Sequence, residues 1–127
     1  MKTVAHVHLL AAWQHNDIDK LKQIISTRVH TIFTKADGST IEMDYDMLIA
    51  EINNAIQVAV ENGWEWQFDV IHKTERGSEN IIVIKISISS GDFESSEKAG
   101  LCVLTFDEDG EARRLIRAYI EEGVTNN

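Results

Sequence analysis

The spacing of hydrophobic and polar residues changes near residue 64. Before that point, apolar residues recur three and four positions apart, which is typical of amphipathic helices. After it, apolar and polar residues alternate, which is typical of strands with one covered face. The pattern therefore predicts an α+β chain with helices first and a sheet second.

Two helices are predicted at the start of the chain. The apolar stripe of the first helix comprises Val4, Val7, Leu10 and Ala11. Gln14 continues this stripe, and Trp13 lies beside it. Asn16 is expected to cap a short second helix, in which Asp17 and Asp19 favour the positive helix end. The apolar stripe of this second helix comprises Ile18, Leu21, Ile24 and Ile25.

A hairpin and a third helix are predicted next. Residues 28–34 are rich in β-branched side chains and precede the turn Asp37-Gly38, after which residues 40–43 can pair back. Asp44 is expected to cap a helix that Gly63 ends in the left-handed conformation. The buried stripe of this helix comprises Leu48, Ile52, Ala55, Ile56 and Ala59.

Four strands are predicted after Gly63, joined by short turns at residues 77–78, 91–92 and 107–110. The last three span residues 81–88, 99–106 and 113–120. The first is expected to have on one face Trp64, Trp66, Phe68, Val70 and His72. Consecutive strands with short connections imply an antiparallel meander.

Composition limits the function more than it identifies it. The 127 residues suit one domain, and the single Cys102 excludes an intramolecular disulfide framework and a multi-cysteine zinc site. The charge of 12 − 21 = −9 disfavours nucleic acid as a partner. The start of the chain is a poor signal peptide and no apolar run reaches membrane-spanning length, so a cytoplasmic location without membrane contact is expected.

No cofactor or metal is expected from the motifs. His6 and His8 would point about 200° apart on a helix, so one ion cannot bind both from one face. Residues 107–110 resemble a calcium loop only superficially, because Ile116 stands where the twelfth-position glutamate is needed. We interpret that segment as a hairpin turn.

The acidic excess is uneven. Residues 1–60 carry 5 − 7 = −2 and residues 61–127 carry 7 − 14 = −7. We expect this charge on turns and outward strand positions, with a nearly uncharged interior.

The element order resembles the nuclear transport factor 2-like superfamily, which includes ketosteroid isomerases and SnoaL-like polyketide cyclases. Thr105-Phe106-Asp107-Glu108-Asp109-Gly110, followed by Arg117-Ala118-Tyr119, looks like the last hairpin of that family. Asn16-Asp17-Ile18-Asp19 is similar to the start of its second helix. The resemblance covers nearly all of residues 1–127 as a single domain. It implies a cone of three helices packed in a curved, mainly antiparallel sheet, with a ligand site at the open end and a dimer surface outside.

The ketosteroid isomerase residues are not expected here. Those enzymes use a tyrosine, an aspartate base and a protonated acid. When this sequence is aligned with the family without gaps from Asp17, Leu9 takes the position of the tyrosine and Phe33 that of the base. The same count back from Phe106 puts Cys102 at the position of the acid. The same resemblance implies a mostly apolar cavity, with these lining residues: Leu9, Trp13, Phe33, Trp66, Cys102 and Ile120.

Four residues allow two interpretations each. Cys102 in an apolar strand is a small buried hydrophobe rather than a reactive thiol. His72 is either a general acid or base at the cavity mouth or an exposed histidine at a strand end. His30 is a weaker candidate, because parity puts it on the face opposite Phe33. Arg117 either holds a carboxylate ligand or pairs with an acidic neighbour in the sheet.

Two classes of function stay open. The first is a non-catalytic protein without isomerase chemistry that binds a small, mostly apolar molecule. A pocket filled by Trp13, Phe33 and Trp66 would favour this non-catalytic class. The alternative is a proton-transfer enzyme of isomerase, cyclase or dehydratase type, acting on a small carbonyl compound with His72 or His30; two convergent polar groups in the pocket favour it. A homodimer through the outer sheet face is expected from the partly apolar odd positions of residues 81–88.

Overall fold

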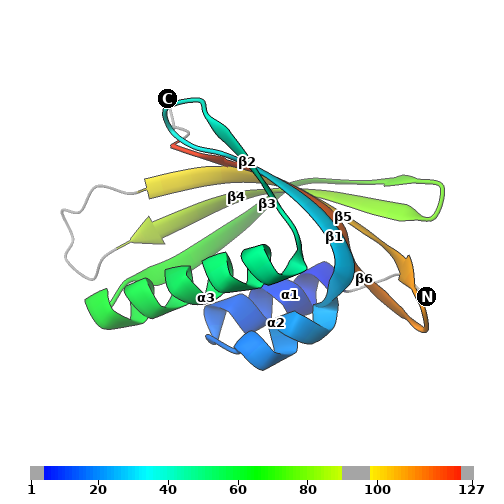
Figure 1. The fold of residues 1–127 in the computed structure, drawn as a ribbon, viewed down its shortest axis with the longest axis horizontal. Coiled ribbons are helices and arrows are strands. Elements are labelled where there is room, and N and C mark those ends of the chain that lie inside the picture. Colours follow the sequence, from blue (N-terminus) through cyan, green and yellow to red (C-terminus); the bar gives the residue numbers. More distant parts are fainter. Residues whose placement is uncertain (1–4, 90–97, 124–127) are drawn as a thin grey trace.

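Three helices pack against one face of a curved six-stranded sheet in the computed structural model of the chain, which describes residues 5–89 and 98–123 (Figure 1). The helices are α1 (Ala5–Gln14), α2 (Ile18–Ile24) and α3 (Tyr45–Asn62). The strands are β1 (Ile25–Thr34), β2 (Thr40–Met43), β3 (Glu65–Arg76), β4 (Glu79–Ser89), β5 (Lys98–Asp109) and β6 (Ala112–Glu122). The predicted α+β architecture is confirmed; Val4 and the predicted turn at residues 91–92 lie outside the described residues.

The sheet has the strand order β2-β1-β6-β5-β4-β3. Strands β3 to β6 form the predicted antiparallel meander, and β1 joins β6 in parallel. We call the face covered by the helices the inner face and the opposite one the outer face. Since residues directly opposite each other on paired strands share a face, the register decides which side chains point to the helices.

The predicted hairpin and third helix are confirmed. β1 pairs with β2, with Thr34 opposite Thr40. The Asp44 carboxylate accepts a hydrogen bond from the Met47 N–H at 2.9 Å, which satisfies a free donor at the start of α3. Gly63 ends α3 at φ 68°, a left-handed conformation that glycine adopts without strain.

The helix face and cap predicted near the start are wrong. α1 buries Ala5, Leu9 and Ala12, while Val7 is half exposed. Its sequence is apolar on several sides, so spacing alone did not select the buried one. The cap of α2 is Asp17, whose carboxylate accepts from the Lys20 N–H at 3.1 Å.

One buried cluster joins the helices to the inner face. Its largest fully buried side chains include Phe106 from β5, Leu21 from α2, Ile25 from β1 and Ile84 from β4. Because each comes from a different element, the helices and the sheet depend on each other for burial. No helix in the described parts is both long and apolar enough to cross a membrane.

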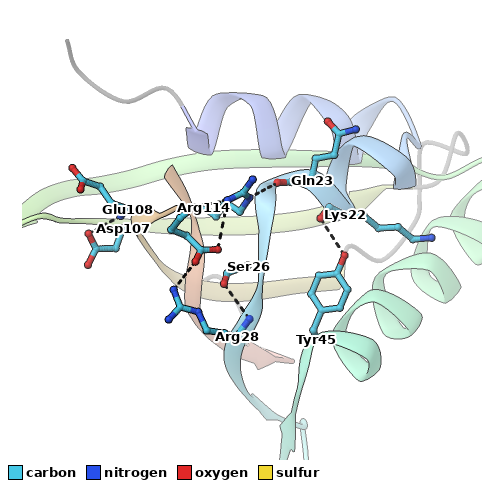
Figure 2. A network of polar contacts seen from close by, with 9 residues as sticks. Lys22, Gln23, Ser26, Arg28, Tyr45, Asp107, Glu108 and Arg114 are labelled. Carbon is cyan, nitrogen blue, oxygen red and sulfur yellow. Dashed lines mark hydrogen bonds and ion pairs between the residues drawn. The ribbon is translucent and has the colours of Figure 1, made fainter. Parts of the chain in front are cut away.

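An arginine network ties the turn between β5 and β6 to the start of β1 (Figure 2). Arg28 donates to the Asp109 carboxylate, and Arg114 donates to the Gln23 carbonyl at 2.9 Å and to the Asp109 carbonyl. The hydrogen bond from Arg28, then one from Ser26, then the nearby positive charges lower the pKa of Asp109. The ionised form of Asp109 is therefore the one that the folded protein favours.

Asp109→Asn should make folding less dependent on pH in the acid range. Folding lowers the pKa of Asp109 below its usual 3.8, so the ionised carboxylate stabilises the folded protein above pH 3.8. This stabilisation is lost as the pH falls through the pKa of the folded state. Urea unfolding should therefore find the wild type more stable than the variant near neutral pH, with the difference shrinking in acid. Glu111→Gln, an exposed change in the same turn, is the control. A difference that does not change with pH would contradict the role given to Asp109.

Candidate functional site

An apolar pocket lies between α1, α3 and the inner face of the sheet. Its volume is about 260 Å³, just below the roughly 300–1,000 Å³ of most small-molecule sites. The lining residues are Trp13, Phe33, Leu48, Glu51, Ile52, Ala55, Trp66, Ile86, Gly100, Cys102, Ile120, Glu121 and Glu122. The size suits a small ligand.

Strand register positions the floor of this pocket. Ile84, Cys102, Ile120 and Phe33 stand opposite one another on β4, β5, β6 and β1, so their side chains form one row across the inner face. Cys102, Ile120 and Phe33 of this row line the pocket, and Ile84 lines an adjoining void. The side of α3 that lines the pocket follows helical spacing and consists of Leu48, Glu51, Ile52 and Ala55. The pocket is thus lined by alternate residues of the strands and by residues three or four apart on α3.

Five of the six residues expected to line the cavity come together in this pocket. They are Trp13, Phe33, Trp66, Cys102 and Ile120. Leu9 is buried and instead lines an adjoining void of about 20 Å³, which also contacts Trp13, Cys102 and Ile120. The six positions therefore surround one continuous apolar region.

Aromatic side chains form one wall of the pocket. The ring centroids of Trp13 and Trp66 are 5.3 Å apart at 67°, an edge-to-face arrangement, and Trp66 lies parallel to Phe68 at 6.3 Å. Neither indole N–H of Trp13 or Trp66 has a hydrogen-bond partner within the described structure. The wall therefore depends on ring packing, and it leaves the pocket open instead of filling it.

The expectation of a nearly uncharged lining is wrong at the pocket mouth. Glu51 lies one helical turn from both Leu48 and Ala55 on α3. Glu122 follows Ile120 by two residues on β6, so the two side chains point to the same face of the sheet. Glu121 has the opposite parity, and its carboxylate accepts a hydrogen bond from the Tyr119 hydroxyl at 2.7 Å. Helical spacing on α3 and strand parity on β6 were the signals that could have identified Glu51 and Glu122.

Cys102 is the buried hydrophobe that its sequence context predicts. It is 2% exposed, and desolvation raises the pKa of its thiol to about 12. The thiol is therefore protonated near neutral pH, and the thiolate is the nucleophilic form.

The expectation that His72 reaches the cavity mouth is wrong. The register of β3 shifts between Val70 and His72, so Val70 stands opposite Ile84 while His72 stands opposite Val83. Ile84 belongs to the inner face and Val83 to the outer face, and His72 is exposed there. A one-residue bulge has moved the histidine to the other side of the sheet.

His30 and Arg117 also lie on the outer face. His30 stands opposite Arg117, on the face away from Phe33, as parity predicts. Its Nε2 is 3.7 Å from the Glu42 carboxylate. Arg117 makes the predicted pair within the sheet, donating to Glu79 at 2.8 Å. Neither residue lines the pocket, and no group of three potential metal ligands occurs among the described residues.

Comparison with known proteins identifies the fold. No protein-family model and no curated protein matches the chain. A structure from Shewanella oneidensis, called an NTF-2 like protein of unknown function, has a TM-score of 0.70 at 15% identity, covering 95% of this chain and 99% of that one. An NTF2-like protein from Cytophaga hutchinsonii has a TM-score of 0.61 at 14% identity, covering 93% and 92%.

A third similar structure has an activity in its name. This protein from Streptomyces avermitilis, called a "putative dehydratase from the NTF2-like family", has a TM-score of 0.70 at 11% identity, covering 96% of this chain and 93% of that one. At such identities the similarity concerns the fold alone. The chain has the nuclear transport factor 2-like fold, as its resemblance to that superfamily implied.

Cys102 should be unreactive in the native protein. A pKa of about 12 leaves a thiolate fraction near neutral pH roughly a thousandfold below that of an ordinary cysteine. Iodoacetamide labelling followed by mass spectrometry should therefore find no alkylation under native conditions and full alkylation in urea. Because the chain has one cysteine, the urea sample is its own positive control. Native labelling as fast as that of free cysteine would contradict the burial.

Proposed function

We propose that this chain of nuclear transport factor 2-like fold binds a small, mostly apolar molecule in the pocket between α1, α3 and the inner face. The observation that carries the proposal is a pocket of about 260 Å³ whose walls are largely aliphatic and aromatic. Transfer of an apolar molecule from water to such a pocket is favourable because it removes apolar surface from water on both sides.

The nature of the pocket lining favours binding over catalysis. A general acid or base must come within hydrogen-bond reach of the substrate. The described lining has no histidine and its cysteine is protonated near neutral pH, so proton transfer there would depend on the exposed carboxylates of Glu51 and Glu122. Ketosteroid isomerase chemistry is absent from the proposal because counting along the sequence puts Leu9, Phe33 and Cys102 where those enzymes have a tyrosine, an aspartate base and a protonated acid.

The alternative remains a proton-transfer enzyme acting on a small carbonyl compound. The name of the Streptomyces avermitilis structure is consistent with that class. The candidate bases His72 and His30 point to the outer face, however, so the alternative needs another base. Glu51 and Glu122 are the pocket carboxylates that remain for that role.

We also propose a homodimer through the outer face. Val83, Val103, Tyr119 and Ile32 stand opposite one another across four strands and form an apolar row there. Tyr119 is 39% exposed. A twofold axis along this row would bring Arg117 of one copy opposite Glu121 of the other, because the two residues flank Tyr119 on opposite sides.

Ligand entry can be followed at individual tryptophans. The protein has three, of which Trp13 and Trp66 line the pocket and Trp64 does not. Titration with 2-phenylethanol, a neutral compound with a small apolar body, should shift the indole N–H resonances of Trp13 and Trp66 in a saturable way. The resonance of Trp64 should shift much less.

A matched pair of variants on α3 tests the location. Ala55→Phe places a ring in the pocket and should abolish the shifts, while Gln57→Phe, on the exposed side of the same helix, should leave them unchanged. Equal shifts in the two variants would show that the compound binds elsewhere.

The dimer should depend on the apolar row. Sedimentation equilibrium at micromolar concentration should give twice the chain mass, and Val103→Lys should give the monomer mass because it puts a charge in the middle of the row. Gln57→Lys, on α3, should stay dimeric. A monomeric wild type would overturn the dimer proposal.

A further inference from the structure

We propose that the pocket selects an organic cation with a small apolar body and one ammonium group held at the mouth between Glu51 and Glu122. This inference rests on the proposed ligand-binding function and adds to it the charge of the ligand. Three features support it, namely two carboxylates at the mouth, an aromatic wall and the lack of basic residues among the described lining positions.

The two carboxylates come from different elements. Glu51 belongs to α3, on the side that also presents Leu48 and Ala55 to the pocket. Glu122 belongs to the end of β6, where its parity with Ile120 puts it on the inner face. A cation at the mouth can therefore interact with a carboxylate from the helix and one from the sheet.

Both carboxylates are available to a ligand. The ion pairs among the described residues engage Glu42, Glu79, Glu108 and Asp109, but neither Glu51 nor Glu122. Neither glutamate accepts a side-chain hydrogen bond within the described parts of the chain, unlike Glu121, which accepts from Tyr119. An incoming ammonium group would not displace an internal partner.

The aromatic wall favours the same sign of charge. The negative faces of aromatic rings attract cations, and tryptophan does so best. Trp13 and Trp66 both line the pocket, with Phe68 packed against them. The indole rings in the lining thus favour a cationic ligand, as the two carboxylates do.

An anionic ligand meets the opposite situation. The described lining residues include no Lys, Arg or His side chain, so among them a ligand carboxylate would find only glutamates. The net charge of −9 adds a long-range field that attracts cations and repels anions. An apolar pocket alone would not distinguish a cation from an anion, so the charges of the lining decide between them.

Three probes with the same ring and similar size isolate the effect of charge. They are 2-phenylethylammonium, 2-phenylethanol and 3-phenylpropionate, titrated near neutral pH at low ionic strength while the indole resonances of Trp13 and Trp66 are followed. The ammonium compound should bind about tenfold more tightly than the alcohol, and the carboxylate more weakly than the alcohol. Added salt should reduce the preference, because exposed charges are screened.

Variants assign the preference to the two glutamates. Glu51→Gln combined with Glu122→Gln should lower the affinity for the ammonium compound to near that of the alcohol, while the affinity for the alcohol stays the same. Glu61→Gln combined with Glu111→Gln is the matched control, because it also removes two negative charges, from exposed positions outside the pocket lining. It should leave the preference intact.

The outcomes separate this inference from the proposed function. If the alcohol binds and the ammonium compound binds no more tightly, the cation proposal is overturned and the apolar pocket function stands. If the double variant keeps the full preference, the glutamates are not its source and the proposal is also overturned. If no probe shifts Trp13 or Trp66, both proposals fail.

Discussion

The two-residue period of the strands is the constraint on which the rest of the structure depends. Along β4 and β5, every second side chain points to the helices, and cross-strand register aligns these side chains with those of β6 into rows such as Ile84, Cys102 and Ile120. The alternation in β6 is interrupted by a register shift between Leu115 and Arg117. One such row forms the pocket floor, and the neighbouring row of Val83, Val103 and Tyr119 forms the apolar outer surface. The inner pocket and the proposed dimer surface therefore arise from one alternating pattern, and a slip of one residue would exchange them.

Local chemistry explains which parts of the fold could be predicted from the sequence. Asp44 and Gly63 mark the ends of α3 because a cap and a left-handed residue act within a few positions of themselves. The resemblance to a known superfamily supplied the lining positions Trp13, Phe33, Cys102 and Ile120, which no local signal gives. α1 shows the limit, since Val7 and Leu9 are equally apolar in the sequence and only packing distinguishes them.

Non-local features escaped prediction. The parallel pairing of β1 with β6 joins residues 87 positions apart, as between Phe33 and Ile120, and its register shifts between Ile25 and His30. The bulge near Ile71 has no glycine to mark it, yet it reverses the facing of every later residue in β3. Helical spacing and strand alternation indicate the faces on which Glu51 and Glu122 lie, but the fact that these two faces line one pocket is a tertiary property.

The bulge in β3 also bears on how such a protein could acquire chemistry. Ile71 is the extra residue, so the loss of its codon would restore regular alternation but leave His72 opposite Val83 on the outer face. His72 would turn to the inner face only if Ile71 took the position opposite Val83, which would put His72 opposite Ile82 and shift every later pair up to the turn at residues 77–78. In evolutionary terms, a change of register at that turn, and not a deletion at the bulge, is the step that would bring this imidazole to the inner surface.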